Sequence, residues 1–388
     1  MYILMIARGI PSERYPQWGC FEKDQAEALV ALGHKVVVAS VDSRFVWSWR
    51  KIGITRNDKN GIVFYNSFLI PGALTGLFGL KFNLFIKQWQ MQRIYKRLVK
   101  EQGKPDIICG HFSFSTCNAV PIAIDNHIPL IGIEHNAIFN EDKLSPHTYF
   151  TSNYAYQHTQ QIIAVSKNLQ ARIKYHLGKE SVVVHNTVGK EFLEAPEAEA
   201  PDKLIKFVAV GNLIFRKGYD LLIQAFTDLD LPHDSWVLNI IGDGEEEETL
   251  QHHINTANLQ NNIFLLGKKN KKEIVNFLTS SHVFMMPSRN ENFSVAILEA
   301  LACGLPIVAS DCGGVRDCIN DSNGIIFPID NVEELKKAIL KIYNRDICFD
   351  NQSIATQCKE NFAPKVIAQK LINVFKQTIE QYETHTNY

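Results

Sequence analysis

Two successive series of short apolar runs constrain the fold of this chain more than any other feature. In the first series, runs of Val, Ile and Leu alternate with helical patterns, beginning with Ile3–Ala7, Phe21–Leu32 and Lys35–Ser40. The runs are continuous and do not alternate with polar residues, which is typical of parallel strands covered on both faces. Further runs lie at 61–65, 106–110, 129–134, 161–165 and 182–185. Residues 1–188 are therefore predicted to form a doubly wound α/β domain.

An acidic stretch rich in Ala and Pro, between Val188 and Lys203, separates this series from a second one. It has no apolar periodicity, which is typical of an interdomain linker. The second series has strand-like runs at 205–210, 236–241, 263–266, 283–286, 307–310 and 325–328. We expect a second parallel-sheet domain over 203–363 and a terminal helix over 364–388, which either crosses back to the first domain or packs on the second. Ligands bind at the carboxyl edges of such sheets, so two facing sheets predict a central cleft.

The composition is that of a compact globular protein. The 388 residues are 46% hydrophobic and 21% charged, which excludes disordered, collagen-like and disulfide-scaffold classes. The apolar start, Met1–Ala7, runs into Arg8 without a cleavage site, and no window has the roughly 18 consecutive apolar residues of a transmembrane helix. The eight cysteines are scattered, as expected for reduced thiols. We expect a cytoplasmic protein.

The net charge of −1 hides a strong asymmetry. Residues 1–190 hold 22 Lys plus Arg and 13 Asp plus Glu, a balance of +9, whereas residues 191–388 hold 18 and 28, a balance of −10. Within the basic half, a predicted amphipathic helix between Leu80 and Leu98 mixes cations with aromatic residues. This segment predicts either peripheral binding to an anionic membrane on its inner face or an ordinary helix that packs on its own sheet.

The first candidate binding motif lies in the second half. The chain has no GxGxxG after its first strand, no P-loop, no HExxH and no GxSxG, so the usual dinucleotide, P-loop, zincin and serine-hydrolase interpretations lack support. A predicted strand ends at Gly211, and the loop that follows carries Arg216 and Lys217 before Gly218 leads into a helix. Two cations beside a helix start are suited to a diphosphate, although a solvated basic turn has the same pattern.

The second candidate motif pairs two carboxylates. Glu291 and Glu299 lie eight residues apart, the first in a loop and the second about two turns into a helix that starts near Ser294. A carboxylate accepts two hydrogen bonds, which suits vicinal sugar hydroxyls, and the amides of Asn292, Phe293 and Ser294 are donors at the helix start. Two acids at this spacing also occur by chance.

Together these motifs resemble the donor half of the retaining glycosyltransferases of family 4. The resemblance rests on Glu291 followed by Glu299-Ala-Leu-Ala-Cys-Gly-Leu-Pro, and on Gly211-Asn-Leu with Lys217-Gly218 upstream. It continues in order through Gly242-Asp-Gly244, Leu266-Gly267 and Met286-Pro287-Ser288, and through Asn186-Thr-Val before the predicted linker. The resemblance covers nearly the whole chain and implies the GT-B fold, with two Rossmann-like domains facing a central cleft.

The resemblance implies roles for residues of the second half. Lys217 would neutralise the donor diphosphate, Glu299 would hold the ribose hydroxyls, and Glu291 with the amides of Asn292–Ser294 would contact the donor sugar. Backbone around Gly267 would lie near the base. Where many members of the family have Arg, this chain has Asn212, so a phosphate contact is missing unless Arg216 supplies it.

The resemblance also implies roles in the first half. Gly19 matches a glycine of the loop that approaches the donor phosphates, but Trp18 occupies the place of the paired glycine. His111 ends a predicted strand and would line the sugar pocket, which makes it a catalytic candidate together with Lys217 and Glu291. Glu134 and His135 close the next predicted strand and would point toward the acceptor.

The predicted activity is transfer of a hexosyl group from a nucleoside diphosphate sugar to a glycan or lipid-linked glycan, with retention at the anomeric carbon. We expect no metal and no cofactor beyond the sugar nucleotide, because the cations and the helix start would stabilise the leaving diphosphate. The alternatives are a GT-B epimerase or phosphorylase, and a non-catalytic module that binds sugar nucleotides or nucleic acid.

Two charged clusters are predicted to be solvated turns. Glu245–Glu248 are consecutive acids on one helix start and cannot converge on one ion. The lysines between 268 and 272 have no aromatic residues among them and lie in the acidic half. We therefore expect no nucleic-acid partner.

Overall fold

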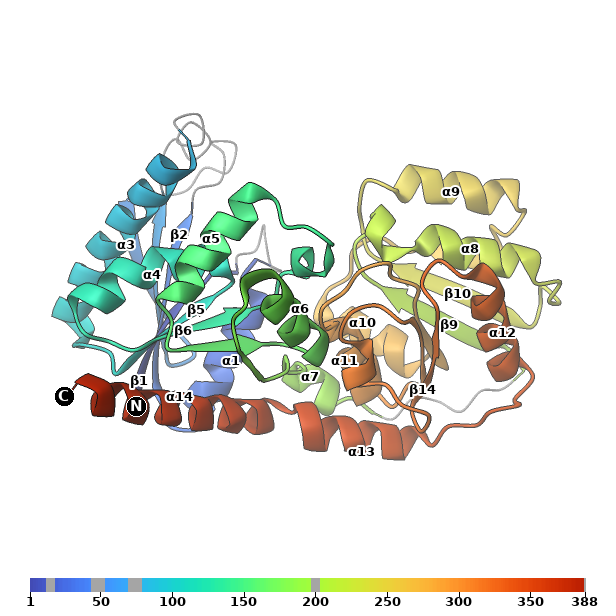
Figure 1. Cartoon of the computed structure of the whole chain (residues 1–388). Helices are drawn as coiled ribbons and strands as arrows, with labels where there is room; N and C mark the ends of the chain where they lie inside the picture. Colours follow the sequence, from blue (N-terminus) through green and yellow to red (C-terminus); the bar gives the residue numbers. More distant parts are fainter. Residues whose placement is uncertain (12–17, 43–52, 69–78, 197–202, 387–388) are drawn as a thin grey trace. The chain divides into compact units, whose positions relative to one another are not determined.

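A computed structural model describes residues 1–11, 18–42, 53–68, 79–196 and 203–386 of the chain (Figure 1). The chain divides into two compact units. Unit 1 comprises Met1–His185 together with Pro364–Tyr388, and unit 2 comprises Asn186–Ala363. Each unit is an α/β domain built on one sheet, as predicted.

The described strands of unit 1 form one eight-stranded sheet in the order β3-β4-β2-β1-β5-β6-β7-β8. All neighbours pair in parallel except β3, which runs antiparallel to β4. All residues of β1, β5 and β6 are buried, because helices cover both faces of the sheet centre. The strands are β1 (Tyr2–Ile6), β2 (Lys35–Asp42), β3 (Gly53–Lys59), β4 (Ile62–Phe68), β5 (Ile107–His111), β6 (Leu130–Glu134), β7 (Gln161–Ala164) and β8 (Val182–Val183).

The described helices of unit 1 are α1 (Cys20–Ala31), α3 (Leu80–Gln102), α4 (Ser113–Asp125), α5 (Pro146–Gln157), α6 (Lys167–Leu177) and α14 (Pro364–Thr386), with a 3-10 helix at Ala137–Asn140. The long helix α14 packs against α1, so the end of the chain belongs to the same unit as its start (Figure 1). Helix ends follow local rules. In α6, for example, Ser166 Oγ accepts a hydrogen bond from the Leu169 amide, and Gly178 ends the helix in the left-handed conformation.

Unit 2 has a six-stranded parallel sheet in the order β11-β10-β9-β12-β13-β14. Its strands are β9 (Ile205–Val210), β10 (Trp236–Ile241), β11 (Ile263–Leu265), β12 (Val283–Met286), β13 (Ile307–Ser310) and β14 (Gly324–Phe327). Its described helices are α7 (Lys190–Leu193), α8 (Tyr219–Asp228), α9 (Glu247–Thr256), α10 (Lys271–Thr279), α11 (Val295–Ala302), α12 (Val332–Tyr343) and α13 (Asn351–Phe362), with 3-10 helices at Phe215–Lys217 and Val315–Asp317.

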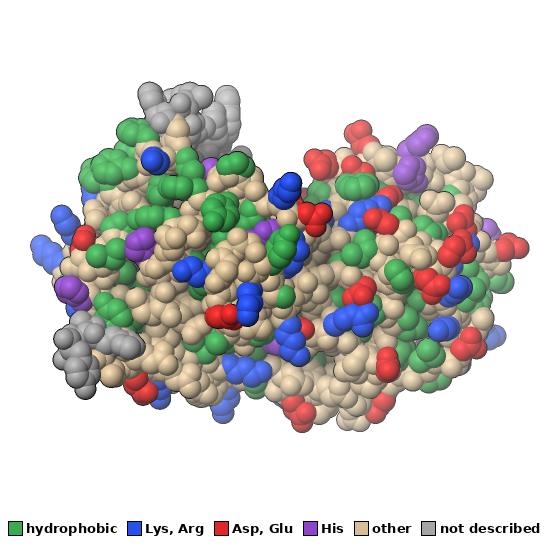
Figure 2. Space-filling model, in the orientation of Figure 1, with side chains coloured by type: hydrophobic (Ala, Val, Ile, Leu, Met, Phe, Trp, Pro, Cys, Tyr) green, Lys and Arg blue, Asp and Glu red, His purple; other side chains and the backbone are tan. Residues whose placement is uncertain are grey.

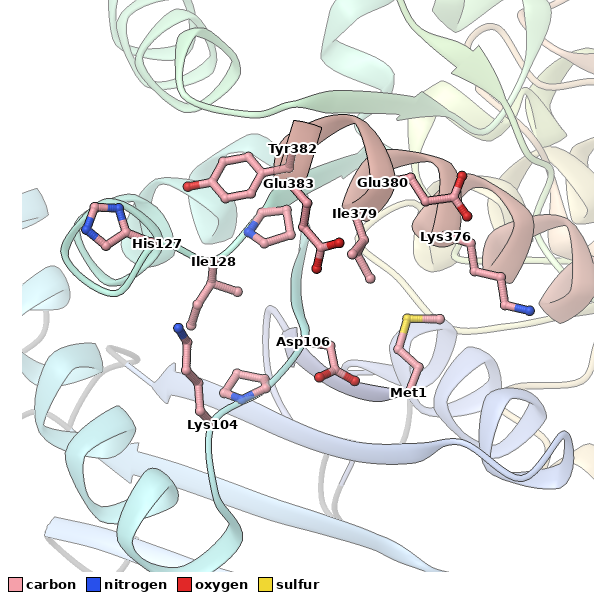
Figure 3. A pocket seen from close by; sticks show the side chains of 12 residues that line it. Met1, Lys104, Asp106, His127, Ile128, Lys376, Ile379, Glu380, Tyr382 and Glu383 are labelled. Carbon is pink, nitrogen blue, oxygen red and sulfur yellow. The ribbon is translucent and has the colours of Figure 1, made fainter. Parts of the chain in front are cut away.

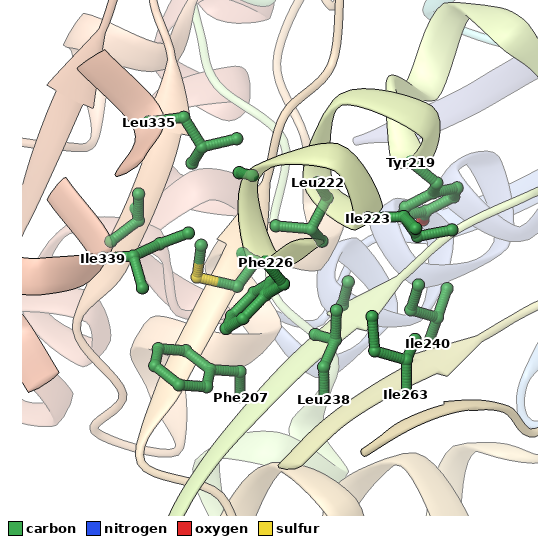
Figure 4. Close-up of a cluster of buried hydrophobic side chains, with 14 of the residues drawn as sticks. Phe207, Tyr219, Leu222, Ile223, Phe226, Leu238, Ile240, Ile263, Leu335 and Ile339 are labelled. Atoms are coloured by element: carbon green, nitrogen blue, oxygen red, sulfur yellow. The ribbon is translucent and has the colours of Figure 1, made fainter. Parts of the chain in front are cut away.

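The core of unit 2 joins α8 and α12 to one face of the sheet (Figure 4). The Phe226 ring stacks on Trp236 at 4.5 Å between centroids and meets Phe207 edge-on at 5.0 Å. All three side chains are fully buried. Burial of side chains of this size contributes about 1.5–3 kcal/mol each, so the cluster fixes α8 against β9 and β10.

Two details differ from the expectations. The antiparallel edge strand β3 was not expected, because its sequence, GITRNDK, is polar and mostly exposed. The predicted linker contains α7, which belongs to unit 2, while its residues 197–202 lie outside the described residues. No helix of the described residues is long and apolar enough to cross a membrane.

The strand order of each sheet identifies a topological switch point, the place where successive strands depart in opposite directions. In unit 1 it lies between β1 and β5, and in unit 2 between β9 and β12. Ligands of open parallel sheets bind at the carboxyl ends of these strands. The loops that leave β1, β5, β9 and β12 are therefore where a site is expected.

Candidate active site

The loops that follow β9 and β12 are held in close contact at the switch point of unit 2. Gly218 has φ +68°, and a Cβ atom there would lie 2.1 Å from the carbonyl oxygen of Pro287. Only glycine allows this approach of two backbones. The contact holds the 3-10 helix Phe215–Lys217 against the residues that follow β12.

The charged side chains of these two loops meet. Lys217 Nζ forms an ion pair with Glu291 Oε1, and the two side chains are only 15% and 12% exposed. Arg216 Nη1 donates to the Asn290 carbonyl at 2.5 Å and lies 3.7 Å from Glu291 Oε1. Three of the predicted donor-site residues, Arg216, Lys217 and Glu291, are thus within reach of one small ligand.

Arg289 fixes this arrangement, and sequence analysis did not identify it. Its guanidinium donates to both carboxylate oxygens of Asp220 at 2.8 and 2.7 Å and to Asp330 Oδ1 at 2.6 Å. It also donates to the Phe215 carbonyl at 2.7 Å and lies 3.9 Å from the centroid of the Phe215 ring. The bidentate pairing and the carbonyl contact tie the Arg216–Lys217 loop to the residues after β12. The signal in the sequence was its position two residues before Glu291.

The start of α11 supplies backbone donors near Glu291. Asn292, Phe293 and Ser294 are 4%, 6% and 7% exposed, and Ser294 precedes the helix without capping it through its side chain. The Phe293 carbonyl accepts a hydrogen bond from Asn186 Nδ2 at 3.3 Å, which anchors the segment. Glu299 lies in the second turn of α11 and is half-buried. This matches the predicted location of Glu299 on the helix.

Two close glycine contacts and one backbone hydrogen bond shape the loops on the other side of β9. A Cβ atom at Gly242 would lie 1.9 Å from the Gly211 carbonyl oxygen, and one at Gly244 would lie 2.2 Å from that of Leu213. Gly267 has φ +66°, and its carbonyl accepts the Gly242 amide at 3.1 Å. Asn212 is exposed in the same region. The structure therefore gathers Asn212 and Gly267 at the ends of β9–β11.

The predicted residues of unit 1 lie at its own switch point, but they are more buried than expected. His111 ends β5 and is 0% exposed, and its Nδ1 lies 3.1 Å from Nε2 of the half-buried His135. Their rings stack at 5.3 Å. Burial lowers the pKa of His111 well below its ordinary value, and the neighbouring His135 and Arg8 add to this, so His111 is neutral at pH 7. His135, and not His111, is the more accessible member of the pair.

Glu134 differs from the expectation that it points toward an acceptor. It is fully buried, and its carboxylate accepts hydrogen bonds from the amides of His135 and Asn136 at 2.9 Å, from the Ser113 amide at 3.1 Å and from the Tyr156 hydroxyl at 2.8 Å. Burial raises its pKa, although these hydrogen bonds oppose the shift. Four internal hydrogen bonds make Glu134 an organiser of the loop that carries His135.

Gly19 forms a tight backbone crossing with Gly9. It has φ +82°, and a Cβ atom there would lie 2.2 Å from the Gly9 carbonyl oxygen. Trp18 lies over Gly9, where its Nε1 would be 1.8 Å from an added Cβ. Trp18, which stands where the family has its paired glycine, therefore fits because Gly9 has no side chain. Residues 12–17, which precede Trp18 in this loop, lie outside the described residues.

A pocket of about 760 Å³ lies elsewhere in unit 1 and contains none of the predicted residues (Figure 3). Met1, Asp106 and Ile128 line it just before β1, β5 and β6, opposite Lys376 and Glu380 of α14. It is thus at the amino edge of the sheet. Ligands of such sheets bind at the carboxyl edge, so we do not assign the pocket to the site.

Comparison with known proteins agrees with this geometry. The family described as "Glycosyltransferase Family 4" matches residues 23–192, and the family "Glycosyl transferases group 1" matches residues 191–361. The two matches adjoin and together span most of both units.

Several relatives and solved structures are similar to the chain. An uncharacterized glycosyltransferase of Methanocaldococcus jannaschii is 29% identical over 66% of this chain and 70% of its own length. A phosphatidylinositol N-acetylglucosaminyltransferase component of Arabidopsis thaliana is 24% identical over 84% of this chain and 72% of its own length. The structure of Anabaena HepE in complex with UDP and glucose superposes with a TM-score of 0.72 at 17% identity, covering 97% of this chain and 99% of that one.

The solved structure supports the fold alone, and the two family matches cover the strands and loops described above except β1 and the loop that contains Gly19. The expected two-domain parallel-sheet architecture is confirmed. The chain belongs to the family 4 type of glycosyltransferases with the GT-B fold.

Proposed function

We propose that this glycosyltransferase moves a hexosyl group from a nucleoside diphosphate sugar to a hydroxyl of a glycan or lipid-linked glycan, with retention at the anomeric carbon. The observation that carries the proposal is the Lys217–Glu291 pair with Arg216 at the switch point of unit 2. Cations and a carboxylate at one such point suit a ligand that has both phosphates and hydroxyls.

Departure of the diphosphate is the step that these residues would assist. The leaving group gains negative charge as the bond to the anomeric carbon breaks, and positioned cations stabilise that charge. Arg216 is held by the Asn290 carbonyl and needs no further ordering, and Lys217 waits beside it on Glu291 until it turns to the diphosphate. In this proposal the cations do the work that a metal ion does in other transferases.

The carboxylates would orient the sugar nucleotide. Glu291 would accept hydrogen bonds from hydroxyls of the donor sugar once Lys217 turns to the diphosphate, and Glu299 would accept them from the ribose. The start of α11, which Ser294 does not cap through its side chain, would add first-turn amides as donors. The HepE structure, which holds UDP and glucose, supports a nucleotide sugar as the donor class.

A stripe along α3 supports an acceptor at a membrane surface. Three aromatic side chains on its exposed face, Phe82, Phe85 and Trp89, are 42%, 59% and 46% exposed. The same face continues with Arg93, Lys96 and Lys100, all exposed. We call these six residues the α3 stripe. Figure 2 shows hydrophobic side chains gathered over the part of unit 1 where Figure 1 has α3 and α5.

The chemistry of the α3 stripe suits an anionic bilayer. Six cations stand in α3 against one carboxylate, Glu101, which is occupied by Arg56, Arg97 and Tyr65. Aromatic side chains insert at the headgroup level, and each cation near an anionic surface adds about 1 kcal/mol of attraction. The phosphatidylinositol N-acetylglucosaminyltransferase relative supports a lipid acceptor, which such a surface would present.

Vesicle co-sedimentation tests the membrane proposal. The wild-type protein is expected to bind vesicles with 30% phosphatidylglycerol and not those of phosphatidylcholine alone. Phe85→Ser/Trp89→Ser should lose binding, whereas the control Tyr175→Ser, at a 70% exposed position on α6, should keep it. Binding that is independent of anionic lipid, or equal in both variants, contradicts the proposal.

Turnover assays test the activity itself. The purified protein is incubated with UDP-, GDP-, ADP- and CDP-sugars, with and without EDTA, and with a lipid extract as acceptor. We expect release of one nucleoside diphosphate, unaffected by EDTA, and a product whose anomeric configuration by NMR equals that of the donor. An inverted product contradicts retention, and a free epimerised sugar nucleotide contradicts transfer.

A further inference from the structure

Arg8 occupies the switch point of unit 1. It follows β1 by two residues, and β5 ends beside it at His111, the strand pair at which the sheet order reverses. Lys217 and Glu291 hold the equivalent place in unit 2, after β9 and β12. A cation at this position lies where an open parallel sheet binds its ligand.

Aromatic rings hold the Arg8 guanidinium in one place. Its Cζ lies over the Trp18 ring at 4.8 Å from the centroid and over the Phe112 ring at 5.0 Å. Stacking uses the faces of the guanidinium plane and leaves the N–H edges for acceptors. The planar fork is thereby ordered in advance, which reduces the entropy lost when it forms hydrogen bonds.

The surrounding backbone is shaped to build this stack. Trp18 reaches Arg8 because it packs directly over Gly9, and Phe112 has φ +64° and ψ +143°, a conformation that is strained for any residue with a Cβ. Such strain persists where the surroundings hold it and is concentrated at ligand sites. Two unusual backbone features therefore serve one guanidinium.

No acidic side chain pairs with this guanidinium in the part of the chain that the structure describes. Its Nε is buried without an acceptor, and the residue as a whole is half-buried. Glu22 accepts a hydrogen bond from the Arg8 backbone amide at 3.1 Å, not from the side chain. Burial raises the pKa of Glu22, and the positive charge of Arg8 opposes this shift. A half-buried guanidinium that forms no salt bridge with a described side chain keeps hydrogen-bond capacity for an anion.

We propose that Arg8 binds a phosphate group of the acceptor substrate. This inference rests on the proposed glycosyl transfer and names the acceptor class as a phosphorylated one, such as a glycan attached to a lipid phosphate. Arginine forms bidentate hydrogen bonds with phosphate, and the stacked guanidinium offers its free N–H edge for them. The donor diphosphate has its own candidate cations, Arg216 and Lys217, in unit 2.

The proposal is tested by ligand binding to the full-length protein, without need for turnover. The probe is glycerol 3-phosphate, with glycerol as the neutral control, and binding is measured by isothermal titration calorimetry at low salt. UDP, GDP, ADP and CDP are titrated in parallel. A charge-assisted bidentate contact is expected to give Arg8→Gln at least a tenfold weaker affinity for glycerol 3-phosphate and an unchanged affinity for the nucleotide.

Lys35→Gln is the control. Lys35 is also a cation over an aromatic ring, with its Nζ 4.4 Å from the Tyr2 centroid, but it is the exposed first residue of β2, at the amino edge of the sheet and away from the switch point. It should bind glycerol 3-phosphate like the wild type. Arg8→Lys is a second variant, for use if Arg8→Gln does not fold, because it keeps the positive charge. It should bind glycerol 3-phosphate more weakly than the wild type does.

Three results would overturn the proposal. The wild type binds glycerol and glycerol 3-phosphate equally; or the Arg8 variants bind the probe as tightly as the wild type; or Arg8→Gln loses nucleotide binding and keeps the probe, which assigns Arg8 to the donor. Each differs from failure of the proposed transfer itself, which would instead leave nucleotide binding absent in the wild type.

Discussion

Lys217 and Glu291 form an ion pair across the two loops at the switch point of unit 2, although 74 residues separate them in the chain. The pair keeps a cation and a carboxylate in the protein interior before any ligand arrives, since both side chains are less than one-sixth exposed. In the proposed function, a diphosphate would take Lys217 and leave Glu291 to accept hydrogen bonds from hydroxyls.

Loss of the Lys217 cation should reduce turnover far more than stability. Lys217→Ala is expected to lower kcat by about 10²-fold or more, because a contact to charge that develops in the transition state is removed. The control is Lys337→Ala, which removes a lysine from an exposed ion pair with Glu334 on α12. Steady-state kinetics measure kcat for both variants, and Lys337→Ala should keep the wild-type value. Wild-type turnover in Lys217→Ala contradicts the assigned role.

Gly218 is expected to tolerate no side chain. Gly218→Ala places a Cβ 2.1 Å from the Pro287 carbonyl at φ +68°, so the loop that carries Lys217 must move. Gly178→Ala is the control, because Gly178 has φ +62° with nothing within 4 Å of an added Cβ. The control should lose only about 1–2 kcal/mol from the left-handed conformation. We expect a larger fall in the thermal midpoint, together with lost activity, for Gly218→Ala. Equal losses in the two variants would show that the contact with Pro287 is unimportant.

Arg289 is predicted to act as a positioning residue. Arg289→Lys keeps the charge but cannot donate to both oxygens of Asp220 and to the Phe215 carbonyl. We expect a stability loss of about 1–3 kcal/mol and a rise in the KM for the donor, since the Arg216–Lys217 loop loses its anchor. Differential scanning calorimetry and kinetics measure the two effects. A variant with unchanged KM would mean that the loop is held by other contacts.

Glu22 should make stability depend on pH in a defined direction. Burial raises the pKa of its carboxyl in the folded chain, so the folded state holds this proton more tightly than the unfolded state does. The contribution of Glu22 is therefore most favourable below the ordinary carboxyl pKa of 4.5 and is lost as the pH rises through the folded value.

Glu22→Gln removes this titration and keeps an oxygen for the Arg8 amide. Relative to the wild type, the variant should gain stability between pH 5 and pH 8. Urea unfolding at both pH values measures the difference, which should be larger at pH 8. A difference that is the same at both values would contradict a raised pKa.

The sequence predicted the two sheets well because buried parallel strands leave an unmistakable pattern. The runs Ile3–Ala7 and Ile205–Val210 became the central strands β1 and β9, and Ser294 precedes α11 as expected. Strand β3 was missed because an exposed edge strand needs no apolar residues. Its pairing with β4 depends on backbone hydrogen bonds, which any residue except proline supplies.

Side-chain burial within the sites was harder to predict. His111 and Glu134 were placed at strand ends correctly. The sequence does not show that the His135 ring contacts His111, or that four donors hydrogen-bond to Glu134. Arg8 and Arg289 were missed because their partners lie far away in the chain, at Phe112 and at Asp220. Strand ends can be read locally, whereas the neighbours of a side chain depend on tertiary contacts.

The most direct test of the account is the thermal midpoint of the purified protein with UDP, GDP, ADP and CDP, for the wild type and for Lys217→Ala. A ligand at 100 times its Kd adds about 2.7 kcal/mol to the stability of the state that binds it. We predict that one nucleotide raises the wild-type midpoint, with or without EDTA, and that Lys217→Ala loses most of this shift. The absence of a shift with every nucleotide, or an equal shift in the variant, would contradict a donor site built on Lys217 and Glu291.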